Sequence, residues 1–191
     1  MASLRGAAGA GGRVVLRELR PDDLPALEEF WTPAVYRWLP ELLQSDDRRD
    51  LSVYLVRSLA EAREVPRTKF QLVAEVSGRL VGTGSVAVRD EHNASGEIGY
   101  ALREDIWNRG YGTELAKALI ETGFATLGMH RVWATVHPQN VASIRVLEKA
   151  GMTYEGRLRD HLRMPGGWRD SLLYAVLGGD QPGPPPAAAG I

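Results

Sequence analysis

The chain has 191 residues, a formal net charge of −1 and no cysteine. Its hydrophobic fraction of 44% and charged fraction of 25% are typical of one globular domain with a sizeable core. The lack of cysteine excludes disulfides and thiolate metal sites, and the charge gives no electrostatic reason to expect nucleic acid or an anionic membrane as a partner. We expect no metal, because the histidines lack metal-ligand spacing. We also expect a cytoplasmic location, because the sequence shows neither a membrane-spanning run nor a signal peptide.

Both ends of the chain are predicted to be disordered. Residues 1–12 are small and rich in Gly and Ala, and residues 178–191 are rich in Pro, Ala and Gly. Such segments bury too little apolar surface to offset the entropy of ordering. The expected domain therefore covers residues 13–177.

The first half of this domain predicts a strand, helical segments and a β-hairpin. Apolar residues spaced for one helix face indicate a helix over Asp46–Arg63, with Ser45 as the candidate N-cap. Ser77-Gly78 is a typical hairpin turn. The other predicted elements are a strand at Val14–Leu19, a helix start at Pro21-Asp22-Asp23, an irregular helix or loop over Trp31–Leu43, and hairpin strands at Phe70–Glu75 and Arg79–Arg89.

The second half alternates strands with helices and ends in another hairpin. Gly151 is a typical residue just after a helix end. The predicted elements are a strand at Gly96–Leu102, a helix at Tyr111–Leu127, a strand at Val132–Val136, a helix at Asn140–Ala150, and hairpin strands at Met152–Met164 and Arg169–Leu177. The order βααβββαβαββ indicates an α/β fold, a mixed sheet covered by helices.

Two helix starts carry most of the chemical information. Trp107-Asn108-Arg109-Gly110-Tyr111-Gly112-Thr113 opens one helix, and His137-Pro138-Gln139-Asn140-Val141-Ala142-Ser143 opens the next. Glycines at a helix start let backbone amides approach an anion, with the helix dipole behind them. A tight turn without a ligand is the alternative. The pattern is neither a Walker loop nor a dinucleotide-binding fingerprint. It favours a phosphate-bearing cofactor with an amide-rich arm.

The segment from Glu97 to Tyr174 resembles the Gcn5-related N-acetyltransferases (GNAT). Within them it is most similar to the RimJ/RimL-type subgroup, which acetylates N-terminal amines of ribosomal proteins, and to its antibiotic- and polyamine-acetylating relatives. The matching motifs are Glu97-Ile98-Gly99-Tyr100, Trp107-Asn108-Arg109-Gly110-Tyr111-Gly112-Thr113-Glu114, and the run from Val136 to Gly151.

The resemblance implies a mostly antiparallel sheet with a central pair of parallel strands that splay apart, flanked by helices. It also implies acetyl-CoA as the co-substrate, with its pantetheine arm between those two strands. A side chain at Gly112 is expected to block the pyrophosphate. Asn140 is expected to bond the pantetheine, or only to cap its helix. The implied cofactor-binding residues are Tyr100, Ala101, Leu102, Trp107, Asn108, Arg109, Gly110, Tyr111, Gly112, Thr113, Asn140 and Ser143.

The chain departs from the family at the position of a common catalytic acid. Many members have a tyrosine seven residues after the asparagine, where this chain has Leu147, which cannot donate a proton. Ser143 lies one helical turn from Asn140 on the same face, so we take it as the residue that stabilises the CoA thiolate. The alternative is a hydroxyl that bonds its own helix backbone.

An amine substrate must lose a proton before it attacks the thioester. Glu97 is the candidate base, acting through a water; a solvated carboxylate at a strand end is the alternative. Tyr100 is expected to be wall or core rather than an acid. Trp31, Tyr36 and Trp38 either line the acceptor site or cap the core.

The predicted activity is direct acetyl transfer from acetyl-CoA to a primary amine, such as a protein N-terminal amine. A small-molecule amine acceptor (an aminoglycoside or a polyamine) is one alternative. The others are a non-catalytic acyl-CoA-binding sensor and a phosphate-binding domain unrelated to CoA. The sequence does not distinguish a monomer from a homodimer.

Overall fold

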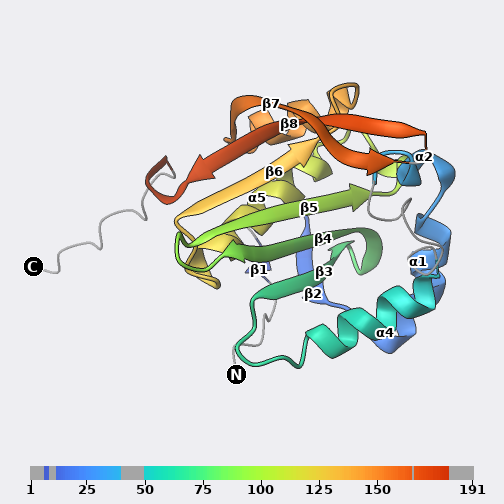
Figure 1. Cartoon of the computed structure of the whole chain (residues 1–191). Coiled ribbons are helices and arrows are strands. Elements are labelled where there is room, and N and C mark those ends of the chain that lie inside the picture. The colour runs from blue at the N-terminus through green and yellow to red at the C-terminus, as the bar shows by residue number, and fades with distance from the viewer. Residues whose placement is uncertain (1–6, 9–11, 40–49, 165, 181–191) are drawn as a thin grey trace, which may run out of the picture.

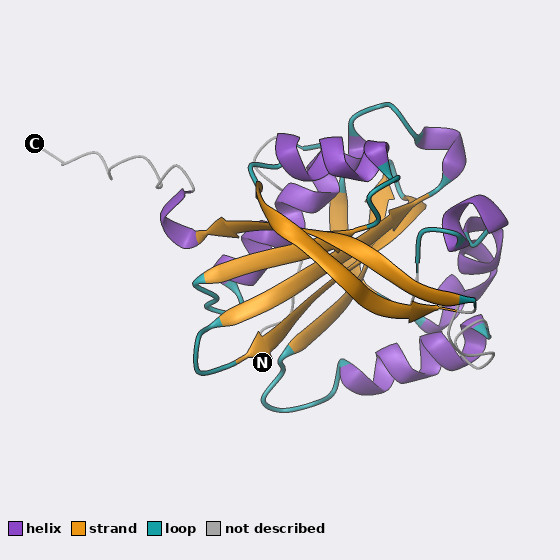
Figure 2. Ribbon diagram, turned by 45° about the horizontal axis from the view of Figure 1, so that its top comes forward, coloured by secondary structure: helices purple, strands orange, loops and turns teal. Residues whose placement is uncertain are grey.

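In the part of the chain that the structure describes, eight strands form one mixed sheet, and helices pack against both of its faces (Figures 1 and 2). The structure is a computed structural model that describes residues 7–8, 12–39, 50–164 and 166–180. The strand order is β1-β2-β3-β4-β5-β6-β8-β7. The strands are β1 (Ala7–Ala8), β2 (Val15–Glu18), β3 (Lys69–Val76), β4 (Arg79–Asp90), β5 (Ser95–Leu102), β6 (Arg131–Val136), β7 (Thr153–Met164) and β8 (Gly167–Leu177).

The described helices fall between these strands, except η4, which follows the last strand. They are η1 (Pro21–Asp23), α1 (Leu24–Phe30), α2 (Pro33–Tyr36), α4 (Leu51–Glu61), η3 (Glu104–Ile106), α5 (Tyr111–Ala125), α6 (Val141–Lys149) and η4 (Gly178–Asp180). In the described part of the chain, none of them is long and apolar enough to cross a membrane.

Neighbouring residues of β3 pack into different cores. Leu72 belongs to the same buried cluster as Leu119 of α5, whereas Val73 belongs to a second cluster with Leu27 of α1 and Leu55 of α4. Successive side chains of a strand project to opposite faces of a sheet. Therefore α5 covers one face, and α1 and α4 cover the other.

The central strands β5 and β6 are parallel and separate towards their carboxyl ends. Their pairing runs from Ser95 opposite Arg131 to Glu97 opposite Trp133. Beyond Glu97, β5 continues to Leu102 along β4, while β6 continues to Val136 along β8. The remaining strand pairs are antiparallel. This arrangement confirms the expected sheet with a splayed parallel pair at its centre.

The hairpin turn and the helix end are formed by the predicted residues. Ser77 and Gly78 have φ angles of 51° and 76°, which is the left-handed geometry that a tight hairpin turn needs. Gly151 follows α6 with a φ of 94°. Both positions show how residues that tolerate positive φ define where regular elements stop.

Two expectations need correction. The helix predicted from Asp46 begins at Leu51, where the Asp50 carboxylate accepts hydrogen bonds from Ser52 N (2.9 Å) and Val53 N (3.4 Å). The proposed cap Ser45 lies outside the described residues. In the N-terminal segment expected to be disordered, Ala7–Ala8 pairs with β2. The rest of residues 1–11 and residues 181–191 lie outside the description, and η4 includes the first residues of the expected C-terminal tail.

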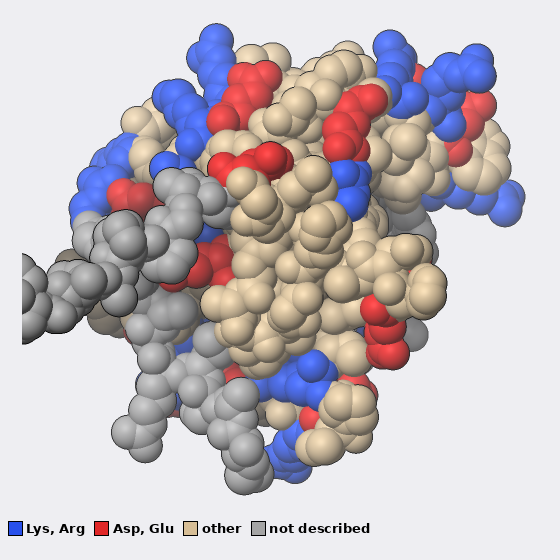
Figure 3. All heavy atoms as spheres, turned by 90° about the vertical axis from the view of Figure 1, so that its left-hand side faces the viewer, with Lys and Arg blue, Asp and Glu red and all other residues tan. Residues whose placement is uncertain are grey.

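Acidic and basic side chains are interspersed on the side of the molecule that carries the C-terminal end of β8, around a central uncharged area (Figure 3). This mixture of both signs on one face agrees with the near-zero formal charge of −1.

Candidate active site

A cavity of about 590 Å³ lies at the splayed ends of the central strands. It is bordered by the end of β5, the loop before α5 and the start of α6. Of the twelve expected cofactor-binding residues, eleven line it; the exception is Arg109. The lining members of that set are Tyr100, Ala101, Leu102, Trp107, Asn108, Gly110, Tyr111, Gly112, Thr113, Asn140 and Ser143.

The loop before α5 presents backbone amides at the start of the helix. Asn108 and Gly110 have φ angles of 62° and 87°, so the chain makes a left-handed approach to the helix. The amides of Thr113 and Glu114 donate to the Gly110 carbonyl at 3.1 and 3.2 Å. The amides before them have no acceptor inside the helix and lie at the positive end of its dipole. This geometry suits a phosphate group.

The N-terminal segment braces this loop from outside the cavity. The Arg13 guanidinium donates to Glu114 Oε1 through Nε (2.9 Å) and Nη2 (2.6 Å), and Nη2 also donates to the Arg109 carbonyl at 2.9 Å. The guanidinium lies 4.3 Å from the centroid of the Tyr111 ring. Arg109 therefore contributes its carbonyl to the brace, and the sequence pattern gave no indication of Arg13.

The Trp107 side chain fastens the other end of the loop. Its indole Nε1 donates to the Leu102 carbonyl at 2.8 Å, so the loop is tied to the last residue of β5. In this chain the tryptophan holds the loop by a hydrogen bond to strand backbone.

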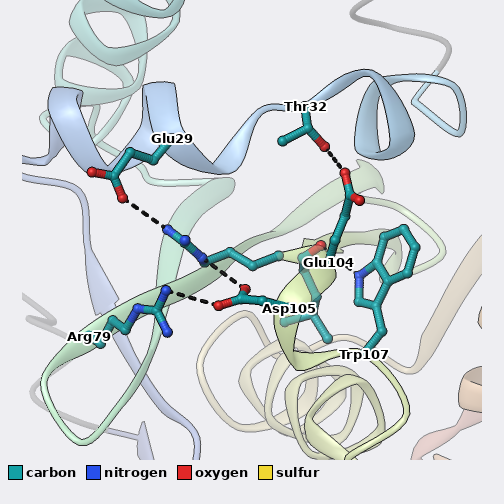
Figure 4. Close-up of polar contacts among 8 residues, drawn as sticks. Glu29, Thr32, Arg79, Glu104, Asp105 and Trp107 are labelled. Carbon is teal, nitrogen blue, oxygen red and sulfur yellow. Dashed lines mark hydrogen bonds and ion pairs between the residues drawn. The ribbon is translucent and has the colours of Figure 1, made fainter.

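A polar network connects the same loop with α1 (Figure 4). Arg103 contacts Glu29 at 3.4 Å and Asp105 at 3.1 Å, and Arg79 contacts Asp105 at 2.9 Å. The Thr32 hydroxyl donates to the carboxylate of Glu104. These contacts hold the segment between β5 and α5 against α1 and against the start of α2.

Gly112 lies where α5 packs against α6, and it also lines the cavity. A Cβ atom there would lie 3.0 Å from Val146 Cγ2 and 3.4 Å from Leu102 Cδ1. A side chain would therefore press on the contact between α5 and α6. The glycine lets the two helices approach closely.

Ser143 and Tyr100 meet inside the cavity. The Asn140 side chain accepts from Ser143 N at 3.2 Å, which makes Asn140 the N-cap of α6. The Ser143 hydroxyl lies 2.9 Å from the Tyr100 hydroxyl. It is therefore paired with a side chain of β5, not with its own helix backbone. Burial raises the pKa of Tyr100, although the hydrogen bond to Ser143 opposes that rise.

A second cavity of about 100 Å³ shares Trp38, Tyr100, Asn140 and Ser143 with the first. It also contains Glu97. The Glu97 Oε2 atom accepts from Arg89 Nε (3.0 Å) and Nη2 (2.9 Å). The expected base therefore lines the small cavity as an ion-paired carboxylate, and Ser143 lines the same cavity.

Leu147 and His137 also line the small cavity. Leu147 is 1% exposed, so an apolar side chain fills the position where many relatives have a tyrosine. Burial, together with the positive charge of Arg169, lowers the pKa of His137. Its Nδ1 accepts from the Gln139 amide at 3.0 Å, so the neutral ring carries its proton on Nε2. The sequence motif did not predict that His137 lines a cavity.

The aromatic residues Trp31, Tyr36 and Trp38 divide between the two expected roles. Trp31 is 9% exposed and packs in the second core, stacked on Tyr36 with ring centroids 5.6 Å apart. Trp38 lines both cavities and lies against the His137 ring at 5.5 Å. Trp31 thus caps the core, whereas Trp38 faces the site.

The splayed strand pair, the amide-lined helix start and the joined cavities define an acetyltransferase of the GNAT fold. The chain belongs to that family, because the model of the acetyltransferase (GNAT) domain matches residues 13–153. It is an N-acetyltransferase. Among the described residues, no group of three or more His, Asp or Glu side chains is arranged to hold a metal ion.

Particular relatives support the RimJ-like subgroup. The chain is 28% identical over 168 residues to the uncharacterized N-acetyltransferase p20 of Bacillus licheniformis, covering 86% of this chain and 93% of that protein. It is 32% identical over 79 residues to the [ribosomal protein uS5]-alanine N-acetyltransferase of Escherichia coli, 41% of each chain. The structure of Mycobacterium smegmatis RimJ in complex with CoA-disulfide matches with a TM-score of 0.77 and 29% identity, covering 95% of this chain and 88% of that one.

Proposed function

We propose that the protein transfers an acetyl group directly from acetyl-CoA to a primary amine. The observation that carries this proposal is the meeting of the two cavities at Tyr100, Asn140 and Ser143. The large cavity reaches the anion site at the start of α5, and the small one contains the Glu97 carboxylate. A donor and an acceptor that enter from these two ends bring their reacting atoms together beside Ser143.

The large cavity fits the coenzyme in size and chemistry. The amides at the start of α5 suit the pyrophosphate, and the free edge of β5 beyond Glu97 suits the amides of the pantetheine arm. The side-chain oxygen of Asn140 accepts the hydrogen bond that caps α6. Its NH₂ group can then donate to the pantetheine arm. The similarity to RimJ, which was solved with CoA-disulfide, supports acetyl-CoA as the co-substrate.

The reaction forms a nitrogen–carbon bond and breaks the carbon–sulfur bond of the thioester. Since the chain contains no cysteine, an acyl-cysteine intermediate is impossible and the transfer is direct. Glu97 takes the proton of the amine through a water. The Ser143 hydroxyl donates a hydrogen bond to the departing thiolate, which takes up the second proton that the nitrogen loses as the amide forms.

The acceptor we favour is a protein N-terminal amine. The similarity to the uS5-alanine N-acetyltransferase supports this class. The small cavity, about 100 Å³ against 590 Å³ for the large one, suits the first residue of a chain whose remainder lies outside. A polyamine or aminoglycoside is the alternative class.

Release of CoA from acetyl-CoA tests the activity, using a thiol reagent and a panel of amines. The protein itself adds no thiol signal, because it has no cysteine. The panel contains peptides with N-terminal Ala or Ser, their N-formylated forms, spermidine and an aminoglycoside. Acetylation of the free peptides alone is the expected result. Preferred acetylation of spermidine or the aminoglycoside would replace the acceptor class, and binding of acetyl-CoA without any transfer would contradict the proposal.

A further inference from the structure

Tyr100 and Ser143 come from different elements and meet where the cavities join. Tyr100 lies near the end of β5, and Ser143 lies in the first turn of α6, 43 residues later. Their hydroxyl oxygens are 2.9 Å apart, and both residues line both cavities. The pair therefore lies where a leaving group in the large cavity and an amine in the small cavity would meet.

The direction of this hydrogen bond follows from the acidity of the two groups. A phenol is a much stronger acid than an aliphatic alcohol, so the Tyr100 hydroxyl is the better donor and the Ser143 oxygen the better acceptor. The other acceptor near the phenol, the Ser143 carbonyl, is farther away at 3.4 Å. With Tyr100 donating, the Ser143 proton is left to point into the cavity.

We propose that Tyr100 is a positioning residue for the transfer, whose phenol orients and polarises the Ser143 hydroxyl so that it stabilises the CoA thiolate. This inference rests on the role proposed above for Ser143. It also bears on Leu147: Tyr100 and Leu147 line the same small cavity, and of these two side chains only that of Tyr100 carries a hydroxyl.

The burial of Tyr100 supports this role. Burial raises its pKa, so the phenol keeps its proton throughout the range in which an amine is acetylated. A hydrogen bond to a charged group is stronger than one between neutral groups. The Tyr100–Ser143 bond therefore strengthens when the Ser143 hydroxyl donates to a thiolate.

The property to measure is the pKa of the thiol of bound CoA, followed by its thiolate absorbance. CoA alone is the probe, so the unidentified acceptor is not needed, and no protein thiol contributes. Other charged or titratable side chains lining the cavities also influence this pKa, but they are the same in every variant. They are Arg37, Glu97, Tyr111, His137, Arg145, Lys149 and Arg169.

We expect Tyr100→Phe to raise the thiol pKa of bound CoA by about one unit, a tenfold weaker preference for the thiolate. Ser143→Ala is expected to raise it at least as much. Tyr100→Phe in the Ser143→Ala background is expected to change nothing further, because Tyr100 acts through Ser143. Turnover with an accepted amine should follow the same pattern, while the KM for acetyl-CoA stays constant.

Tyr174→Phe is the matched control. Its hydroxyl contacts Glu148 at 3.3 Å, and Tyr174 does not line either cavity. Melting temperature and CoA affinity of every variant separate a folding defect from a loss of positioning. Ser143→Thr, which retains a hydroxyl, should keep most of the wild-type thiol pKa.

The possible outcomes separate the two proposals. If Ser143→Ala leaves the thiol pKa unchanged, the role of Ser143 and with it that of Tyr100 are wrong. If Ser143→Ala raises the pKa but Tyr100→Phe does not, only the positioning role is overturned. Independent, additive effects of the two substitutions would also overturn it, because they would show that Tyr100 acts without Ser143.

Discussion

Arg13 and Glu114 are 101 residues apart in the chain, yet two guanidinium nitrogens of Arg13 bond Glu114 Oε1 at 2.9 and 2.6 Å. Burial alone would raise the pKa of Glu114, but the hydrogen bonds and charge of Arg13 outweigh it and lower that pKa. The same guanidinium holds the Arg109 carbonyl. Arg13 thus stabilises the conformation of the loop before α5.

Replacing Arg13 by Ala is expected to weaken acetyl-CoA binding several-fold. The loop loses its outer brace, so part of the binding free energy must be spent on ordering it. Isothermal calorimetry measures the dissociation constant. Arg57→Ala is the matched control, because Arg57 also pairs with a glutamate (Glu61) but lies on α4. Equal affinities in Arg13→Ala and wild type would refute the brace.

The two glycines of the loop are expected to respond differently to Ala. Gly110 has a φ of 87°, where an L side chain costs about 1–2 kcal/mol, so Gly110→Ala should distort the loop and weaken acetyl-CoA binding. At Gly112 the new Cβ would press on Val146 at 3.0 Å. Gly112→Ala should therefore mainly lower the free energy of unfolding, by about 1 kcal/mol.

Gly128→Ala controls for the backbone strain. Gly128 has a φ of 62°, and nothing lies within 4 Å of the Cβ it would gain. It should lose stability like Gly110→Ala but keep its acetyl-CoA affinity. Calorimetry and denaturant unfolding of the three variants decide the matter. A larger affinity loss for Gly112→Ala than for Gly110→Ala would contradict this assignment.

Replacing Glu97 by Gln is expected to lower kcat by about 10²–10⁴-fold at neutral pH, the usual contribution of a general base. Acetyl-CoA affinity should stay constant, since Glu97 lines only the small cavity. Raising the pH towards the pKa of the acceptor amine should recover part of the rate, because the amine then loses its proton without help. Unchanged kcat would remove Glu97 from the mechanism.

Glu155→Gln is the control for this substitution. Glu155 is also a strand glutamate paired with an arginine, Arg131, and it does not line either cavity. Its kcat and pH profile should match those of the wild type. The comparison separates the loss of a base from the general loss of an ion pair on the sheet.

Because of the ion pair between Arg17 and Asp23, the free energy of unfolding is expected to decrease at acidic pH. Burial would raise the pKa of Asp23, but the hydrogen bonds and charge of Arg17 and the Arg20 amide outweigh it and lower that pKa from 3.8. A carboxyl whose pKa is lower in the folded state stabilises the protein above its unfolded pKa. This stabilisation is lost as the pH falls through the folded value.

Asp23→Asn should therefore cost about 1.5–3 kcal/mol at neutral pH, because Arg17 loses one charged partner and keeps the other, Glu75, at 2.7 Å. The difference from wild type should be constant near neutral pH and shrink below about pH 4. Denaturant unfolding at a series of pH values measures it. A difference that persists at low pH would assign the loss to packing instead of charge.

Local patterns predicted the elements well because their causes are local. The period of apolar residues defines α5, and the positive φ of Ser77-Gly78 defines a hairpin turn. The predicted start of α4 was wrong. Several acidic or hydroxyl residues precede the apolar stripe, each of them a possible N-cap, and the residue that caps the helix is Asp50. Ala7–Ala8 pairs with β2, and the Gly/Ala-rich pattern of that segment gave no indication of a strand.

The site was predictable where a motif lies in one stretch of chain. The amide-lined start of α5 and the cap at Asn140 are of that kind. The Tyr100–Ser143 bond and the Arg13 brace join distant segments, and no single-sequence pattern encodes such a pair. The direction of a side chain at Gly112 depends on how α5 packs against Val146, which is likewise a property of the folded molecule.

The early end of the β5–β6 ladder has a consequence for amide hydrogen exchange. Beyond Glu97, β5 keeps its partner β4 up to Leu102 but has left β6. Since alternate amides of a strand face opposite neighbours, slow and fast exchange should alternate from Gly99 onwards. Binding of acetyl-CoA should slow the fast set, because an extended arm with its own amides completes the ladder as an added strand would. Under the proposed function, the bound coenzyme would therefore act as an added strand along β5, and its release would expose the edge of that strand.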